Sequence, residues 1–181
     1  MSVIEKTACF TGHRPEKLPS DSYKLNLIKQ MLRNAAFDAA VRGYTTFFTG
    51  MQRGTDLWAA KTVSELTDRF PVEVVAVYPF RDIGKSYKGE DAELFEEIQR
   101  KAADTIIISE SYYGGCYSAR NKYMVEHSSH IIAIVEDYNS GTGQTIAYAK
   151  KRGLSTDIID LKKTFYDLAD GSNDIPEQLT F

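Results

Sequence analysis

The sequence predicts an α/β protein in which helices cover both faces of a mostly parallel sheet of five to six strands. Two observations carry this prediction. Short apolar runs alternate with stretches of helical periodicity along the chain, a pattern typical of βαβ units. The chain also has 181 residues, of which 43% are hydrophobic, so a single domain with a substantial core is expected.

Six apolar runs predict the strands, at residues 3–10, 45–49, 72–78, 105–109, 131–135 and 155–161. The third run is rich in valine and the fourth contains three consecutive isoleucines, and both features favour strands. The fifth run is entirely apolar, as expected for a strand buried on both faces. The sheet has six strands if the sixth run also forms a strand, and five if it does not.

Five helices are predicted between these strands, at residues 21–42, 56–69, 90–102, 118–128 and 142–152. In the first helix, Leu25, Ile28 and Leu32 recur three or four residues apart, which places them on one face. Gly43 and Pro71 stand just beyond the first two helices, where such residues end a helix. Residues 1–161 are therefore predicted to form one domain, and residues 162–181 a polar tail that is either a short helix or partly disordered.

Composition narrows the functional classes. Lys and Arg number 22 and Asp and Glu 25, giving a formal net charge of -3, which disfavours a nucleic-acid partner. No apolar run approaches the ~18 residues needed to span a bilayer, and no secretory signal is visible, so no membrane partner is expected. The two cysteines, Cys9 and Cys116, fit a cytoplasmic protein with reduced thiols.

Glycines, hydroxyls and arginines gather in the segments that follow the predicted strands. In an open parallel sheet, ligands bind beyond the carboxyl ends of the strands, where glycine-rich turns and helix N-termini favour phosphate. We therefore predict a phosphate- and ligand-binding set formed by Gly12, Arg14, Gly50, Arg53, Gly54, Arg120, Asn121, Ser140, Gly141, Thr142, Gly143 and Thr145. Phe80 and Tyr113 are candidates to stack on a base.

Each of these features also has a plainer interpretation. Gly50 and Gly54 could serve only a tight turn, and Ser140 and Asp56 could be helix N-caps. His13 could cap the backbone at the end of a strand. A Walker A loop, the dinucleotide glycine pattern, a nucleophile elbow and a metal-ligand cluster are all missing from the sequence, so no metal is expected.

A family resemblance rests on five motifs: Thr11-Gly12-His13-Arg14-Pro15, Gly50-x-x-x-Gly54-x-Asp56-x-x-Ala59-Ala60, Tyr78-Pro79-Phe80, Arg120-Asn121-x-Tyr123-Met124-Val125 and Ser140-Gly141-Thr142-Gly143-x-Thr145. Their order and spacing over residues 3–160 resemble the YpsA-like branch of the SLOG superfamily. That branch is bacterial, and the superfamily also includes the Lonely Guy phosphoribohydrolases and the Rossmann part of DprA. The resemblance implies a three-layer αβα modified Rossmann fold. It also implies binding of a nucleotide or nucleotide-derived ligand, such as ADP-ribose or an NAD-derived molecule, and a homodimer. The helix faces that carry Trp58 or Tyr123 are candidate partner surfaces.

Three functional hypotheses follow. The first is a binder or sensor of a nucleotide-type phosphorylated ligand. The second is cleavage of the base from a nucleoside monophosphate, with Asp56 as the carboxylate and His13 as an acid or orienting group. The Lonely Guy loop carries two glutamates that serve hydrolysis, and the corresponding residues 141–148 contain none, which makes binding the first hypothesis. The third, disfavoured by the net charge, is single-stranded DNA binding as in DprA.

Overall fold

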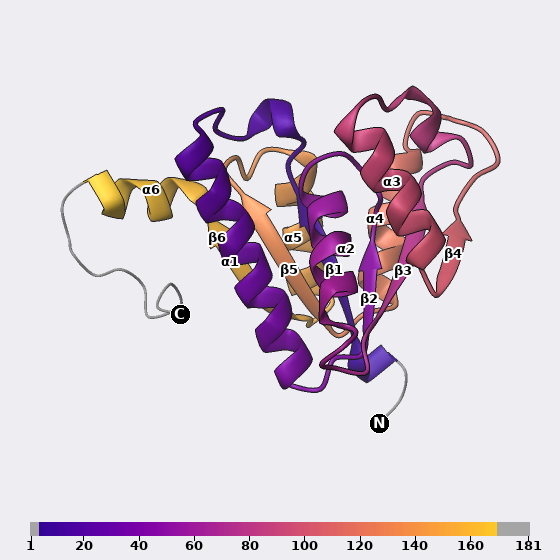
Figure 1. Ribbon diagram of the computed structural model, residues 1–181, viewed down its shortest axis with the longest axis horizontal. Helices are drawn as coiled ribbons and strands as arrows, with labels where there is room; N and C mark the ends of the chain where they lie inside the picture. The colour runs from indigo at the N-terminus through magenta and orange to yellow at the C-terminus, as the bar shows by residue number, and fades with distance from the viewer. Residues whose placement is uncertain (1–3, 170–181) are drawn as a thin grey trace.

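The computed structural model describes residues 4–169, and within them six parallel strands form one sheet (Figure 1). The strands are β1 (Thr7–Gly12), β2 (Thr46–Thr49), β3 (Glu73–Tyr78), β4 (Asp104–Ile107), β5 (His130–Val135) and β6 (Ser155–Asp160). Their order across the sheet is β4-β3-β2-β1-β5-β6. The predicted α/β fold with a mostly parallel sheet is confirmed, because every observed strand pair is parallel.

Helices cover both faces of this sheet. The helices are α1 (Ser22–Val41), α2 (Thr55–Leu66), α3 (Glu90–Lys101), α4 (Cys116–Glu126), α5 (Gly141–Lys151) and α6 (Leu161–Ala169). On one face α2 packs between α1 and α3, and on the other face α4 packs against α5. Three short 3-10 turns complete the described chain, at Ile4–Lys6, Pro15–Lys17 and Ile83–Ser86. The result is the three-layer αβα arrangement of a Rossmann-like fold.

The strand order reverses beside β1. From β1 the chain steps outward through β2, β3 and β4, and then returns to place β5 on the other side of β1. The loops after β1 and β5 therefore leave the sheet in different directions and open a crevice between them. The carboxyl ends of the strands point to the upper edge of the sheet in Figure 1.

The core consists of two apolar layers, one on each side of the sheet. On the α1–α2–α3 side, Phe10 and Phe47 stack with ring centroids 5.8 Å apart beneath buried helix residues such as Ile28 and Leu57. On the other side, Met124 of α4 packs in a second cluster. All six residues of β5 are buried, as its apolar sequence predicts. Burying side chains of this size contributes about 1.5–3 kcal/mol each, which fixes the sheet edge that carries the loops.

The predicted bounds differ from the observed ones mainly at the ends of elements. The first strand starts at Thr7 instead of residue 3 and extends to Gly12, because Thr11 and Gly12 continue the pairing with Ala133 and Ile134 of β5. Helix α4 begins at Cys116, earlier than predicted, after Gly115 adopts a φ of 107°. Of the predicted tail, residues 162–169 lie in α6, and residues 170–181 lie outside the described residues.

A search of the described residues for a helix that is long and apolar enough to cross a membrane finds none.

Candidate functional site

The crevice at the strand-order reversal holds a hollow of about 330 Å³, which we call the central hollow. It is lined by the loop after β1, by residues that follow β2, by the first turns of α4 and by the start of α5. The lining residues are Thr11, Gly12, His13, Arg14, Lys17, Gln52, Asp56, Tyr117, Arg120, Asn121, Ser140, Gly141 and Thr142. Loops that are far apart in the sequence therefore meet at one place.

A buried ion pair forms one wall of the central hollow. Arg120 Nη1 lies 3.2 Å from Asp56 Oδ2, and each side chain is only 7% exposed. The same Nη1 donates to the carbonyl of Gly50, and Asp56 Oδ2 also accepts from the backbone N–H of Gln52 at 3.2 Å. Burial raises the pKa of Asp56, and the neighbouring Arg120 guanidinium opposes that rise. Arg120 Nε has no hydrogen-bond partner in the structure.

Gly50 is what lets Arg120 reach this position. A Cβ on Gly50 would lie 1.5 Å from Arg120 Nη1 and 2.6 Å from Asp56 Oδ2. The next residue, Met51, is fully buried and adopts a φ of 57°, a strained conformation for a residue other than glycine. The turn between β2 and α2 is therefore shaped around the guanidinium.

His13 ties the loop after β1 to the loop after β5. Its Nε2 lies 3.0 Å from the backbone nitrogen of Glu136 and 3.4 Å from that of Asp137. Because backbone N–H groups can only donate, Nε2 accepts and the proton of the neutral ring is on Nδ1. Burial lowers the pKa of His13, and Lys17 lowers it further. In this position His13 has the backbone-capping role that the plainer interpretation gave it.

The start of α5 presents its first turn to the central hollow. Ser140 caps the helix, and its Oγ accepts from the Gly143 amide at 3.2 Å. Gly143 packs too tightly for any side chain, since a Cβ there would lie 2.0 Å from the carbonyl oxygen of Tyr138. At Gly141, by contrast, a Cβ would meet nothing within 4 Å. The Gly141 and Thr142 amides therefore belong to a helix end that carries a partial positive charge.

Arg14 lies at the rim of the central hollow. Its guanidinium carbon is 5.3 Å from the centre of the Tyr117 ring. The side-chain amide of Gln52 has one orientation in which its nitrogen donates to Tyr87 and its oxygen accepts from Arg14. In that orientation the oxygen lies 3.0 Å from Arg14 Nε and 2.9 Å from Arg14 Nη2. Arg14 is thus held at the rim by Gln52 and Tyr117.

A second hollow of about 500 Å³, which we call the flanking groove, lies between α4 and α5. It shares Tyr117, Asn121 and Gly141 with the central hollow, so the two spaces adjoin at these residues. Asn121 is fixed there because its Nδ2 donates to Thr145 Oγ1 at 2.9 Å, and Thr145 in turn donates to the Gly141 carbonyl at 2.8 Å.

The structure brings some predicted residues into the hollows and places others outside them. Ten line one or both spaces: Gly12, His13, Arg14, Asp56, Arg120, Asn121, Ser140, Gly141, Thr142 and Thr145. Gly50, Gly54 and Gly143 stand behind the lining, where they allow close packing; a Cβ on Gly54, for instance, would lie 2.8 Å from Pro15 Cδ.

Three predicted residues face elsewhere. Arg53 pairs with Glu16, and its Nη1 lies 3.6 Å from Asp91. Phe80 packs edge-on against the rings of Tyr112 and Tyr117. Tyr113 is 46% exposed and lines neither hollow.

Sequence reasoning missed Lys17, Gln52 and Tyr117, which line the central hollow. Each lies within three residues of a predicted site residue, and that proximity was the available signal. Among residues 4–169, no group of three or more His, Cys, Asp or Glu side chains could hold a metal ion.

Fold and hollows together define a Rossmann-like α/β protein whose candidate ligand site lies at the reversal of strand order. The profile described as the YspA SLOG family matches residues 8–164. The chain belongs to this family, which confirms the resemblance inferred from the motifs.

Two relatives match nearly the whole length of this chain. A UPF0398 protein of Pediococcus pentosaceus is 25% identical over 173 residues, covering 90% of this chain and 92% of that protein. One of Bacillus thuringiensis is 26% identical over 172 residues, covering 91% and 94%.

Two solved structures share the fold. DNA processing protein A (DprA) of Streptococcus pneumoniae superposes with a TM-score of 0.61 at 13% identity, over 94% of this chain and 58% of that one. DprA of Helicobacter pylori, whose structure concerns its single-stranded DNA binding mode, superposes with a TM-score of 0.60 at 14% identity, over 93% and 75%. This chain therefore spans little more than half of the pneumococcal DprA chain.

Proposed function

We propose that this protein binds a nucleotide or nucleotide-derived phosphorylated ligand in the central hollow and the flanking groove. The observation that carries the proposal is the convergence of Arg14, Lys17 and the first turn of α5 on one hollow, which the buried Arg120 also lines.

The charges around the central hollow favour an anion. Arg14, Lys17 and Arg120 line it, and Asp56 is the carboxylate among its lining residues. Because Asp56 is already paired with Arg120, Arg14 and Lys17 are left to attract a negatively charged group. A helix N-terminus beside two such side chains is a common arrangement for phosphate.

The flanking groove suits the rest of such a ligand. Tyr117 offers an aromatic face at the junction of the two spaces, and Asn121 and Gln144 offer amides. A phosphate in the central hollow would leave a ribose and base to extend past Gly141 between α4 and α5. Tyr117 therefore replaces Phe80 and Tyr113 as the favoured stacking residue in this proposal.

Isothermal titration with a panel of nucleotides, including AMP, ADP-ribose and NAD, tests the proposal. We expect micromolar or tighter binding of at least one member. Gly141→Leu is the matching variant, because its side chain enters open space where the two hollows join and meets no protein atom at Cβ. It should abolish binding without lowering the melting temperature.

Gly114→Leu is the control, since a Cβ there also meets nothing within 4 Å and Gly114 lines neither hollow. It should bind as the wild type does. Absence of micromolar binding to every panel member, or equal binding by Gly141→Leu, would contradict the proposal.

Cleavage of an N-glycosidic bond is less well supported than binding. Asp56, the proposed carboxylate, is held in the ion pair with Arg120, and Nε2 of His13, the proposed acid, accepts from the backbone. Incubation with AMP, GMP and CMP, followed by chromatography for free base, tests this alternative. Release of base that is lost in Asp56→Asn would establish the enzyme.

Single-stranded DNA is a second candidate ligand. Its support is the fold shared with DprA together with the exposed rings of Tyr112 and Tyr113, which follow β4 at the same edge of the sheet. Exposed aromatic rings can stack on unpaired bases. Fluorescence anisotropy with a labelled oligonucleotide at several salt concentrations tests this candidate, because binding to a phosphate backbone weakens steeply with salt.

A further inference from the structure

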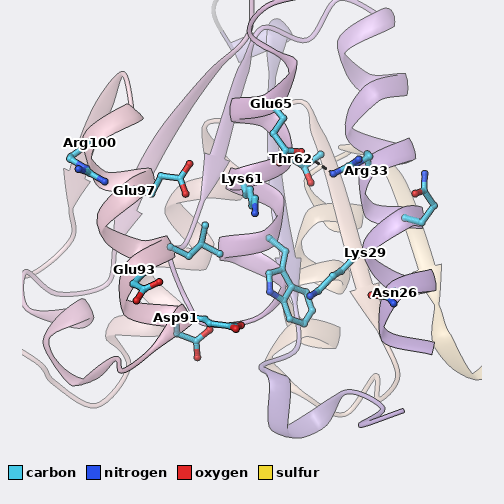
Figure 2. Close-up of a pocket in the computed structure, with 14 residues that line it drawn as sticks. Asn26, Lys29, Arg33, Lys61, Thr62, Glu65, Asp91, Glu93, Glu97 and Arg100 are labelled. Carbon is cyan, nitrogen blue, oxygen red and sulfur yellow. Dashed lines mark hydrogen bonds and ion pairs between the residues drawn. The ribbon is translucent and has the colours of Figure 1, made fainter. Parts of the chain in front are cut away.

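A groove of about 810 Å³ runs along the outer surface of the α1–α2–α3 layer (Figure 2). We call it the charged groove, and it shares no lining residue with the central hollow or the flanking groove. The side chains that matter here are Lys29 and Arg33 on α1, Trp58 and Lys61 on α2, and Glu93 and Glu97 on α3.

Charges of opposite sign are separated across this groove. The α1 wall contributes the cations Lys29 and Arg33, whereas the α3 wall is dominated by carboxylates. Four cationic and five anionic side chains line the groove in total, so it is nearly neutral as a whole. A nearly neutral surface with segregated signs repels an identical surface little and can complement it in a suitable orientation.

The charged residues of the two walls also lie at matching positions along the helix axes. Figure 2 shows Lys29 of α1 across the groove from Glu93 of α3, and Arg33 across from Glu97, with α2 between the walls. Consider a twofold axis that lies in the plane of the interface and runs along α2. Rotation about it exchanges the sides of α1 and α3 but leaves each residue at the same position along the helix axis. Under that rotation, the α1 wall of one copy faces the α3 wall of the other.

We propose that the charged groove is the surface through which two copies of this chain associate, with the twofold axis along α2. Lys29 of each copy then faces Glu93 of the other, and Arg33 faces Glu97. A twofold axis perpendicular to the helices would instead place α3 on α3, and the carboxylates would repel each other. The charge pattern therefore selects one orientation.

The contacts that these side chains make within one copy are easily exchanged. Lys29 Nζ lies 4.6 Å from the centre of the Trp58 ring, and Arg33 pairs with Glu65 at 2.9 Å with both side chains about half exposed. Exposed pairs of this kind are worth little. Association replaces them with pairs between the walls of the two copies, which are shielded from water.

Charge reversal with complementation tests this arrangement. Sedimentation equilibrium over the micromolar range should show a dimer of the full chain that weakens as salt is added. Lys29→Glu/Arg33→Glu makes both walls acidic, and Glu93→Lys/Glu97→Lys makes both walls basic. Each double variant should weaken self-association by at least about tenfold.

An equimolar mixture of the two double variants should associate again, because every acidic wall then meets a basic one. This recovery separates the proposal from simple misfolding, and circular dichroism of each variant checks the fold. A chain that stays monomeric throughout the concentration range, a dimer that the reversals leave unchanged, or a mixture that fails to associate would overturn the proposal.

Discussion

Arg120 contributes both to the packing of the fold and to the lining of the candidate site. Its guanidinium bridges the Gly50 carbonyl and the Asp56 carboxylate, and the residue lines the central hollow. An arginine that is 5% exposed holds its geometry before a ligand arrives. Such preorganisation reduces the entropic cost of binding an anion.

Arg120→Met is predicted to destabilise the protein by about 3–5 kcal/mol, because it removes one partner of a buried ion pair and leaves the other desolvated. Urea unfolding followed by the fluorescence of Trp58 measures the loss. Asp56→Asn/Arg120→Met is the control and should recover part of the stability, since no charge then stays unpaired. A cost below about 1 kcal/mol for the single variant would mean that the pair behaves like an exposed one.

His13 is predicted to make the protein sensitive to mild acid. Burial lowers the pKa of this imidazole in the folded state below the ordinary value of 6.5, so the unfolded chain binds the proton more tightly. The stabilisation is complete above pH 6.5 and is lost as the pH falls from there through the lower pKa of the folded state. The free energy of unfolding, measured at several pH values in this window, should fall with a smaller slope in His13→Gln, and identical slopes would contradict the prediction.

The elements show how much of the fold the sequence predicts. Alternating apolar runs and helical stretches were sufficient for the layers and the parallel sheet, because strands buried on both faces need continuous apolar sequence. The end of the first strand was wrong because Thr11 and Gly12 give no apolar signal, although both pair with β5. Tertiary pairing decides such boundaries, and local patterns do not contain it.

The sequence predicts which loops form the candidate site better than it predicts which side chains point into it. Parallel strands bring their carboxyl ends to one edge, so the segments around Gly12, Gly50 and Gly141 had to lie near one another. The direction of each side chain depends on backbone conformation. With Met51 at a φ of 57°, Gln52 faces the central hollow while Arg53 reaches Glu16 instead.

The end of α1 and the edge strand β6 are joined by a polar cluster, which leads to a second acid-dependent prediction. Asp157 Oδ2 lies 3.0 Å from Nε2 of the buried His130 and 2.5 Å from Arg42 Nη2. The hydrogen bond from His130 is the main cause that lowers the pKa of Asp157, and the charges of His130 and Arg42 add to it.

For a carboxylate whose pKa is lower in the folded state, the stabilisation is present above the ordinary value of 3.8 and is lost as the pH falls through the folded pKa. Asp157→Asn should therefore be less stable than the wild type near neutral pH and should approach it in strong acid. Acid titration of the unfolding free energy for both proteins measures this convergence. A constant difference at every pH would assign the loss to packing instead of charge.

At the scale of the whole molecule, the two proposed functions lie on different surfaces. The central hollow opens at the carboxyl edge of the sheet, whereas the charged groove lies on the outer side of α1, α2 and α3. The two share no lining residue, so ligand binding and self-association can be separated by mutation. Variants in the charged groove serve as controls for the hollow, and Gly141→Leu serves as a control for the groove.

The last prediction concerns the coupling between ligand and global stability. A ligand that binds only the folded state stabilises it by about 2.7 kcal/mol at a concentration one hundred times its Kd. For a chain of this size, that corresponds to a rise in Tm of roughly 5–10 °C. Differential scanning calorimetry with the tightest member of the nucleotide panel should show this rise in the wild type and in Lys29→Glu/Arg33→Glu at fixed protein concentration. Gly141→Leu should keep the Tm of the ligand-free wild type at every ligand concentration, because the hollow is filled while the fold is intact. An equal rise in Gly141→Leu would place the bound nucleotide somewhere other than the junction of the two hollows.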